Sequence, residues 1–158
     1  MLVNGWHSDR TQERFLHIVV PLCITLVANI IAVSTLNIAA RYVAMMLLPT
    51  SFYSAAVVIL SWITGTLAQP SIKRASAIAF INAVCNTPNI WASYLYYGSP
   101  RFMTAFLVNL AATAGAIAFA TVTRMWLVKE NRKLDRGQDT GKNGPTAAQI
   151  AGGFRYLI

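Results

Sequence analysis

Charged side chains are scarce in this sequence, and that scarcity is the first constraint on its class. Only 11% of its 158 residues are Asp, Glu, Lys or Arg, whereas 56% are hydrophobic. Soluble domains carry about 25% charged residues. A soluble fold of this length would need more polar surface than these residues provide. The composition therefore argues against an ordinary soluble domain and points to a membrane.

Cysteine and histidine are also rare, and this bears on chemistry. Cys23 and Cys85 lie in apolar segments without metal-site spacing, so we expect reduced cysteines that pack as small apolar side chains. His7 and His17 have no third ligand near them in the sequence, so no metal site is predicted. The sequence has no glycine-rich phosphate loop and no paired carboxylates that would mark a cleft. It therefore supports neither an enzyme nor a bound cofactor.

What the sequence does contain is four long stretches without Asp, Glu, Lys or Arg: residues 15–40, 42–72, 75–100 and 102–123. Each exceeds the roughly 20 residues that a helix needs to cross a hydrocarbon core. In lipid, a helix satisfies its own backbone hydrogen bonds. We predict an all-α membrane protein whose four transmembrane helices contact the lipid bilayer at about 15–36, 42–66, 75–97 and 102–127.

The basic residues are distributed unevenly. With four spans, eleven of the 13 Lys and Arg residues fall on the side that holds both termini, and only Arg41 and Arg101 fall on the other. Loops rich in Lys and Arg stay in the cytoplasm. Both termini are therefore predicted to be cytoplasmic, and the net charge of +8 reflects topology and not a nucleic-acid partner.

Two polar segments flank the spans. Residues 1–14 are predicted to form a cytoplasmic loop, and residues 128–158 a cytoplasmic tail that is mostly disordered because it is polar and rich in glycine. The last five residues, "FRYLI", are apolar again, and we expect them to dock weakly against the spans.

Neutral polar residues lie on single faces of two spans. Asn82, Asn86 and Asn89 share one face of the third span, either as a helix–helix seam, which we favour, or as the wall of a water-filled path. In the second span, Tyr53 is expected near the bilayer centre beside Ser54, facing either a substrate cavity or a satisfied core. No carboxylate or amine lies deep in a span, so a coupling group would have to lie elsewhere.

The opening stretch "NGWHSDRTQER" resembles the cytoplasmic-loop signature of the major facilitator superfamily, Gly-x-x-x-Asp-Arg-x-Gly-Arg-Arg. Gly5, Asp9, Arg10 and Arg14 match in register. Gln12 replaces the signature's glycine, and Glu13 replaces one of its arginines.

A second resemblance covers the third span. "PSIKRASAIAFINAVCNTPNIWASYLY" followed by "PRF" is similar to helix 11 of the fungal allantoate, pantothenate and vitamin permeases, an anion:cation symporter branch of that superfamily. The matching residues are Lys73, Arg74, Ala75, Asn82, Asn86, Pro100 and Arg101. Cys85 stands where this branch usually has glycine.

The resemblance implies a fold and a function. The four spans would be helices 9–12 of a twelve-helix plasma-membrane carrier, within its C-terminal six-helix bundle, and the missing N-terminal helices would be their partners. The substrates would be small organic anions or vitamins, coupled to protons. Tyr53, Ser54, Asn82 and Asn86 become candidates for the substrate cavity.

The resemblance also implies a gating loop formed by Gly5, Asp9, Arg10, Arg14, Lys73 and Arg74. Within that set we expect Asp9 to contact the helix that begins near Lys73 and Arg74, as a latch on the cytoplasmic side. Because alternating access needs two bundles around a central site, we expect a chain of this length to be inactive alone. The alternative is a self-contained four-span scaffold or interaction subunit.

Overall fold

The computed structural model describes residues 2–66, 71–97, 101–137, 144–145 and 150–158, apart from the side chains of Ser71 and Lys73. Over these residues the regular structure is helical, which confirms the all-α prediction. The elements are α1 (Leu2–Thr11), α2 (Phe15–Ser34), α3 (Ile38–Thr66), α4 (Ser71–Asn86), α5 (Pro88–Trp91), the 3-10 helix η1 (Ala92–Leu95) and α6 (Met103–Asp135).

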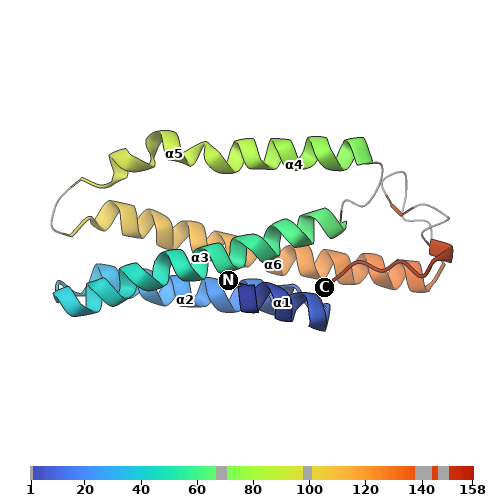
Figure 1. The fold of residues 1–158 in the computed structure, drawn as a ribbon, viewed down its shortest axis with the longest axis horizontal. Helices are drawn as coiled ribbons and strands as arrows, with labels where there is room; N and C mark the ends of the chain where they lie inside the picture. Colours follow the sequence, from blue (N-terminus) through green and yellow to red (C-terminus); the bar gives the residue numbers. More distant parts are fainter. Residues whose placement is uncertain (1, 67–70, 98–100, 138–143, 146–149) are drawn as a thin grey trace.

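Three helices form the body of the structure. α2 packs along α3 and α6, whereas α4 and α5 run to one side of this group (Figure 1). In the described part of the chain, α2, α3 and α6 are the helices long and apolar enough to cross a membrane. The chain is therefore an integral membrane protein with three such helices, at the positions of the first, second and fourth predicted spans.

The third predicted span, 75–97, is not one continuous helix. α4 ends at Asn86, and α5 and η1 follow as two short turns. Pro88 explains the break, because proline has no backbone N–H and its ring clashes with the preceding turn. Around it the backbone tightens: the Thr87 and Ile90 amides donate to carbonyls only three residues back, at 3.1 Å each.

The core lies where the three long helices meet, in two clusters. One cluster joins Ile18 and Leu22 of α2 to Val58 and Trp62 of α3 and Leu127 of α6. The other is built from small residues, with Ala28 and Ala44 packed against Phe106. Small side chains allow membrane helices to approach closely, so the second cluster holds α2 and α3 near their connecting turn.

Proline also explains how α1 docks. Pro21 has no N–H to donate to the His17 carbonyl one turn earlier in α2, which leaves that carbonyl without its helical partner. The Asn4 side chain of α1 donates to this oxygen at 3.0 Å. The carbonyl that Pro21 leaves without a helical partner in α2 therefore binds α1 through Asn4.

The described parts of the two flanking segments contain helix that was not predicted, and the last five residues pack against the spans as expected. Residues 2–11 form α1 where a loop was expected, and α6 continues to Asp135, past the predicted end at 127. Residues 154–158 pack against the helices, whereas residues 138–143 and 146–149 of the predicted disordered tail lie outside the described residues.

Gln12, the residue directly after α1, has an unfavourable backbone conformation. Its φ of 57° lies in the left-handed region, which costs about 1–2 kcal/mol for a residue other than glycine. This position, just after a helix, is where proteins usually place glycine. The signature that this stretch resembles has glycine at the position of Gln12. A positive φ at this position would explain why glycine is preferred there.

We therefore predict that Gln12→Gly stabilises the protein. The relief of strain exceeds the added freedom of the unfolded chain, for a net gain of about 0.5–1 kcal/mol. Unfolding of the micelle-bound protein by sodium dodecyl sulfate, followed by circular dichroism, measures the change. Thr11→Gly, one residue earlier and inside α1, should destabilise by a similar amount. A loss of stability in Gln12→Gly would contradict the account.

Candidate functional site

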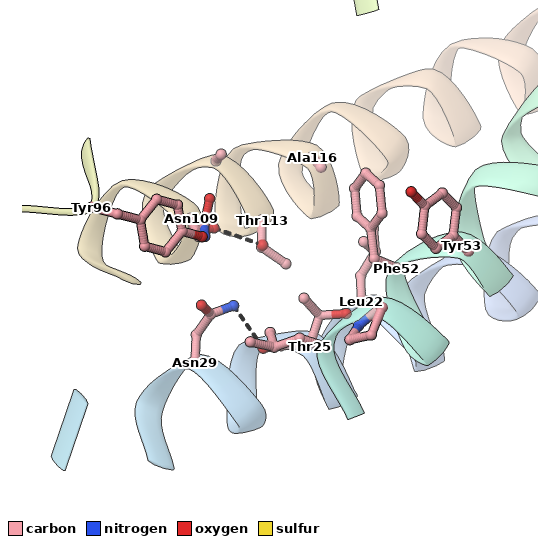
Figure 2. Close-up of a pocket in the computed structure, with 12 residues that line it drawn as sticks. Leu22, Thr25, Asn29, Phe52, Tyr53, Tyr96, Asn109, Thr113 and Ala116 are labelled. Atoms are coloured by element: carbon pink, nitrogen blue, oxygen red, sulfur yellow. Dashed lines mark hydrogen bonds between the residues drawn. The ribbon is translucent and has the colours of Figure 1, made fainter. Parts of the chain in front are cut away.

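A cavity of about 400 Å³ opens between the long helices. α2, α3 and α6 supply most of its wall, and Tyr96, just after η1, closes one end (Figure 2). The lining residues are Leu22, Thr25, Asn29, Leu48, Pro49, Phe52, Tyr53, Tyr96, Asn109, Ala112, Thr113 and Ala116. None of these lining residues is charged, so any polar ligand held here meets only neutral partners.

The polar side chains of the wall are held by hydrogen bonds, both within a helix and between α2 and α3. Thr25 and Ser51 share a hydrogen bond at 2.8 Å that ties α2 to α3, and Asn29 donates to the Thr25 carbonyl at 2.9 Å. On α6, the Thr113 hydroxyl donates to the Asn109 carbonyl at 2.7 Å. These bonds fix the rotamers of the wall, which preorganises the cavity.

The aromatic side chains complete the wall from α3. Phe52 and Tyr53 contact each other edge to face, with ring centroids 5.6 Å apart. Figure 2 shows both rings on the side of α3 that faces α6, across from Asn109 and Thr113. The cavity therefore combines apolar rings with neutral donors and acceptors, the usual composition of a small-molecule site.

The predicted cavity residues do not come together here. Tyr53 lines the cavity, whereas Ser54 is buried outside it, and its carbonyl is 3.5 Å from the Asn4 side-chain nitrogen. Asn82 and Asn86 lie exposed on α4, joined by an Asn86-to-Asn82 hydrogen bond at 2.8 Å within that helix.

Four polar residues of the wall were not predicted from the sequence. Thr25 and Asn29 are four apart on α2, as are Asn109 and Thr113 on α6. This is the same spacing that marked the asparagine face of the third span. The same search applied to the first and last spans would have found them.

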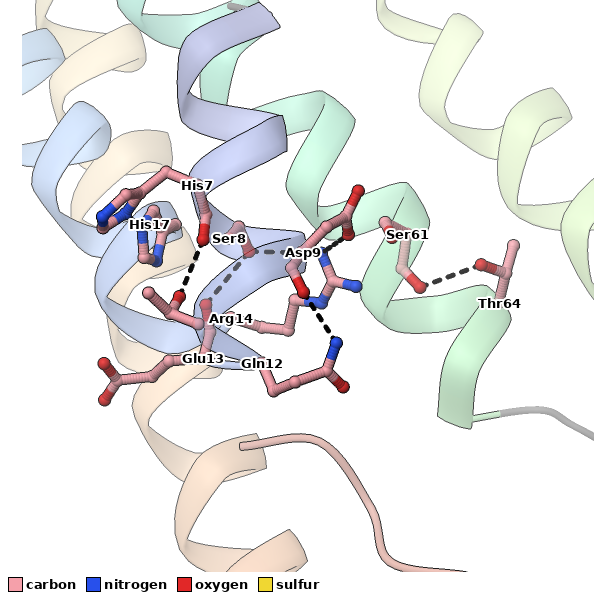
Figure 3. Close-up of polar contacts among 10 residues, drawn as sticks. His7, Ser8, Asp9, Gln12, Glu13, Arg14, His17, Ser61 and Thr64 are labelled. Carbon is pink, nitrogen blue, oxygen red and sulfur yellow. Dashed lines mark hydrogen bonds and ion pairs between the residues drawn. The ribbon is translucent and has the colours of Figure 1, made fainter.

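A second polar cluster lies where α1 meets α2 (Figure 3). Asp9 and Arg14 form a salt bridge at 2.5 Å, and Arg14 also donates to the Ser8 hydroxyl at 3.2 Å. The Ser8 hydroxyl in turn donates to the Glu13 carbonyl at 3.0 Å. The Arg14 side chain is only 7% exposed, so Asp9 supplies a counter-charge to a buried cation.

The other predicted gating residues are more loosely placed. Arg10 stacks on the Trp6 ring at 5.4 Å, and Arg74 is exposed on α4, while the Lys73 side chain lies outside the described part. A methyl group on Gly5 would meet Val57 at 4.0 Å, an ordinary contact, so the packing does not require glycine there. The described ion pairs join Asp9 to Arg14 and not to Arg74.

The two histidines, ten residues apart in sequence, meet in this cluster. His7 Nδ1 and His17 Nε2 lie 2.6 Å apart, a distance at which the N–H of one ring donates a hydrogen bond to the bare nitrogen of the other. The described residues contain no group of three or more His, Cys, Asp or Glu that could hold a metal ion. The pair forms a hydrogen-bonded contact between α1 and α2.

Comparison with known proteins gives two relatives, both from Schizosaccharomyces pombe and both named as uncharacterized transporters. One is 27% identical over 99% of this chain and 32% of its own length. The other is 30% identical over 79% of this chain and 26% of its own length. The chain thus spans about a third or less of the relatives that it matches. No family model matches the chain, and no solved structure matches it.

We predict that the Asp9–Arg14 salt bridge stabilises the junction of α1 and α2. Asp9→Asn leaves a buried guanidinium with a weaker partner and should cost about 1 kcal/mol, limited by the 64% exposure of Asp9. Glu13→Gln is the matched control, because its pair with Arg124 spans 3.9 Å between half-exposed side chains. Equal stability of both variants in detergent unfolding would contradict the prediction.

Proposed function

We propose that this chain forms part of a secondary carrier of the major facilitator superfamily that moves small organic anions or vitamins, coupled to protons. The observation that carries the proposal is the alignment of 99% of the chain with about a third of a protein named as a transporter. Three membrane-length helices around a cavity are consistent with that role. The resemblance of the sequence to the fungal vitamin permease branch supplies the substrate class.

Within such a carrier, the cavity would hold the uncharged part of the substrate. Its lining offers hydroxyls, amides and aromatic rings but no charged side chain. An anion buried in a membrane needs a compensating positive charge, so that charge, like the proton-binding group, would come from helices outside this chain. Asn82 and Asn86 remain candidates for a second polar wall, because α4 exposes them.

The cluster around Arg14 would act on the cytoplasmic side. α1 and the chain's last residues lie at the same end of the long helices, as the hydrogen bond from the Arg14 amide to the Ile158 carbonyl demonstrates. The excess of basic residues at this end would keep it in the cytoplasm. Asp9 would exchange its partner Arg14 for the α4 residues Lys73 or Arg74 when the carrier changes state.

Two measurements test the proposal. The transcript that encodes this chain should continue upstream through about eight more transmembrane helices, and the protein it encodes should take up pantothenate, allantoate, nicotinate or biotin in a proton-dependent manner. The 158-residue chain alone, reconstituted in liposomes, should transport none of them. A clean transcript start at Met1 together with a stable, inactive chain would favour the scaffold alternative.

We predict that cavity residues affect uptake more than their neighbours do. In the full-length carrier, Thr113→Val and Tyr53→Phe each remove one hydroxyl from the wall. Each should raise KM about two- to tenfold, the effect of one lost hydrogen bond. Ser54→Ala is the matched control, because Ser54 lies outside the cavity. If both cavity variants keep the KM of the unaltered carrier while Asn86→Ala raises it, the substrate site lies at the α4 face and not in this cavity.

A further inference from the structure

The last five residues, Phe154–Ile158, form a strap across one end of the three long helices. The Arg14 amide at the start of α2 donates to the Ile158 carbonyl at 2.9 Å, and Trp62 Nε1 of α3 donates to the Leu157 carbonyl at 2.9 Å. On α6, the Asn131 side chain bonds both the carbonyl and the amide of Tyr156, at 2.9 and 3.0 Å. One short segment thus touches all three helices.

Side chains of the strap extend the core of this end. Tyr156 and Leu157 pack against the cluster that contains Trp62 and Leu127. A Cβ added to Gly65 of α3 would lie 3.8 Å from Leu157 Cδ1, so the strap passes close to the backbone of α3. The strap therefore fills a groove that the helices alone would leave open.

The attachment is suited to release. The strap has no regular secondary structure, and Gly153 just before it adopts a φ of 77°, a turn that glycine makes easily. Its side chains are at most partly buried. Its backbone makes four hydrogen bonds to the helices, of about 0.5–1.5 kcal/mol each, and the exposed Arg155 side chain adds an ion pair with Asp135. It can detach without the unfolding of any helix.

Tyr156 is the point at which charge would act on the strap. Tyr156 packs against the apolar cluster that contains Trp62 and Leu127, where a negative charge would lose its hydration, so the docked position disfavours that charge. In agreement, burial and the neighbouring Glu130 of α6 raise the pKa of the Tyr156 hydroxyl. Glu130 is itself buried and is bonded to Lys133 at 2.6 Å. Arg155, next to Tyr156 in the strap, pairs with Asp135 at 2.8 Å.

We propose that Phe154–Ile158 is a detachable strap that locks the ends of α2, α3 and α6 together, and that a negative charge on Tyr156 releases it. This device rests on contacts within the chain and holds whether or not the chain belongs to a carrier. While the strap is docked, it holds the start of α2 and the ends of α3 and α6 at fixed distances from one another. Once it detaches, these ends are free to move apart.

Disulfide trapping tests the docked position. In a Cys23→Ser, Cys85→Ser background, Gly65→Cys with Leu157→Cys should cross-link readily under mild oxidation of the full chain in micelles. Gly65→Cys with Ile150→Cys is the control, since Ile150 is exposed and precedes the strap. Equal cross-linking in the two pairs would overturn the proposal.

Thiol labelling tests release. With Leu157→Cys alone, the maleimide labelling rate reports the detached fraction. Asn131→Ala removes two hydrogen bonds to Tyr156 and should raise that rate at least about fivefold, whereas exposed Arg132→Ala should leave it within twofold. Helical circular dichroism checks that each variant is folded. Identical rates in the two variants would show that the strap is not held by Asn131.

Charge dependence is tested at Tyr156 itself. Tyr156→Glu should raise the Leu157→Cys labelling rate at least about fivefold, because burial and then Glu130 disfavour the new carboxylate, and Tyr156→Phe should not. In a variant whose remaining tryptophan is Trp62, release should shift the emission to longer wavelength as the indole loses the strap. Equal behaviour of the Glu and Phe variants would remove charge as the trigger.

The pH dependence has a defined sign. Because docking raises the Tyr156 pKa above its ordinary value of 10.0, the contribution of the neutral Tyr156 to docking is fully present below pH 10.0 and is lost as the pH rises through the raised value. The Trp62 emission should therefore shift only above about pH 10. Tyr156→Phe should abolish the shift, whereas a shift that persists would assign it to Lys133 or another group near Glu130.

Discussion

Inside a hydrocarbon core a backbone amide or carbonyl has no water to bond, and most of this structure follows from that constraint. It makes the apolar segments helical, and it decides what each proline does. Pro21 leaves the His17 carbonyl without a partner, and Asn4 of α1 supplies one. Pro88 leaves the third apolar segment unable to continue as an α-helix, and α4 ends two residues before it.

The same constraint shapes the cavity and the strap. In the cavity wall, Thr25, Asn29 and Thr113 use carbonyls of their own helices as hydrogen-bond partners, which holds these side chains in place. At the end of the bundle, Trp62 and the Arg14 amide find acceptors in the carbonyls of the last two residues. The carrier proposal and the strap proposal thus rest on different residues and can fail separately.

Some of the site followed from the sequence and some did not. The charge-free runs located α2, α3 and α6, although α6 continues to Asp135 and the predicted span ended at 127. Tyr53, a candidate for a substrate cavity on sequence grounds, lines the cavity described here, and its role in substrate binding stays a prediction. The partners of Tyr53 were not found, because Thr25, Asn109 and Thr113 look like ordinary polar residues until the helices are placed side by side. Asn82 and Asn86 share a helix face, as the hydrogen bond between them indicates, yet both are exposed and neither lines the cavity.

The sequence alone determined the class of structure, because hydrophobicity and charge act residue by residue and need no knowledge of neighbours. It predicted an all-helical membrane protein with most of its basic residues on one side of the membrane. Tertiary structure decided the pairings: Asp9 with Arg14, His7 with His17, and the final residues with Trp62 and Asn131. Such contacts depend on helix packing and on where each helix stops. Gln12 at a positive φ follows the end of α1, and Pro88 follows the end of α4, so these two residues help to set where those helices end.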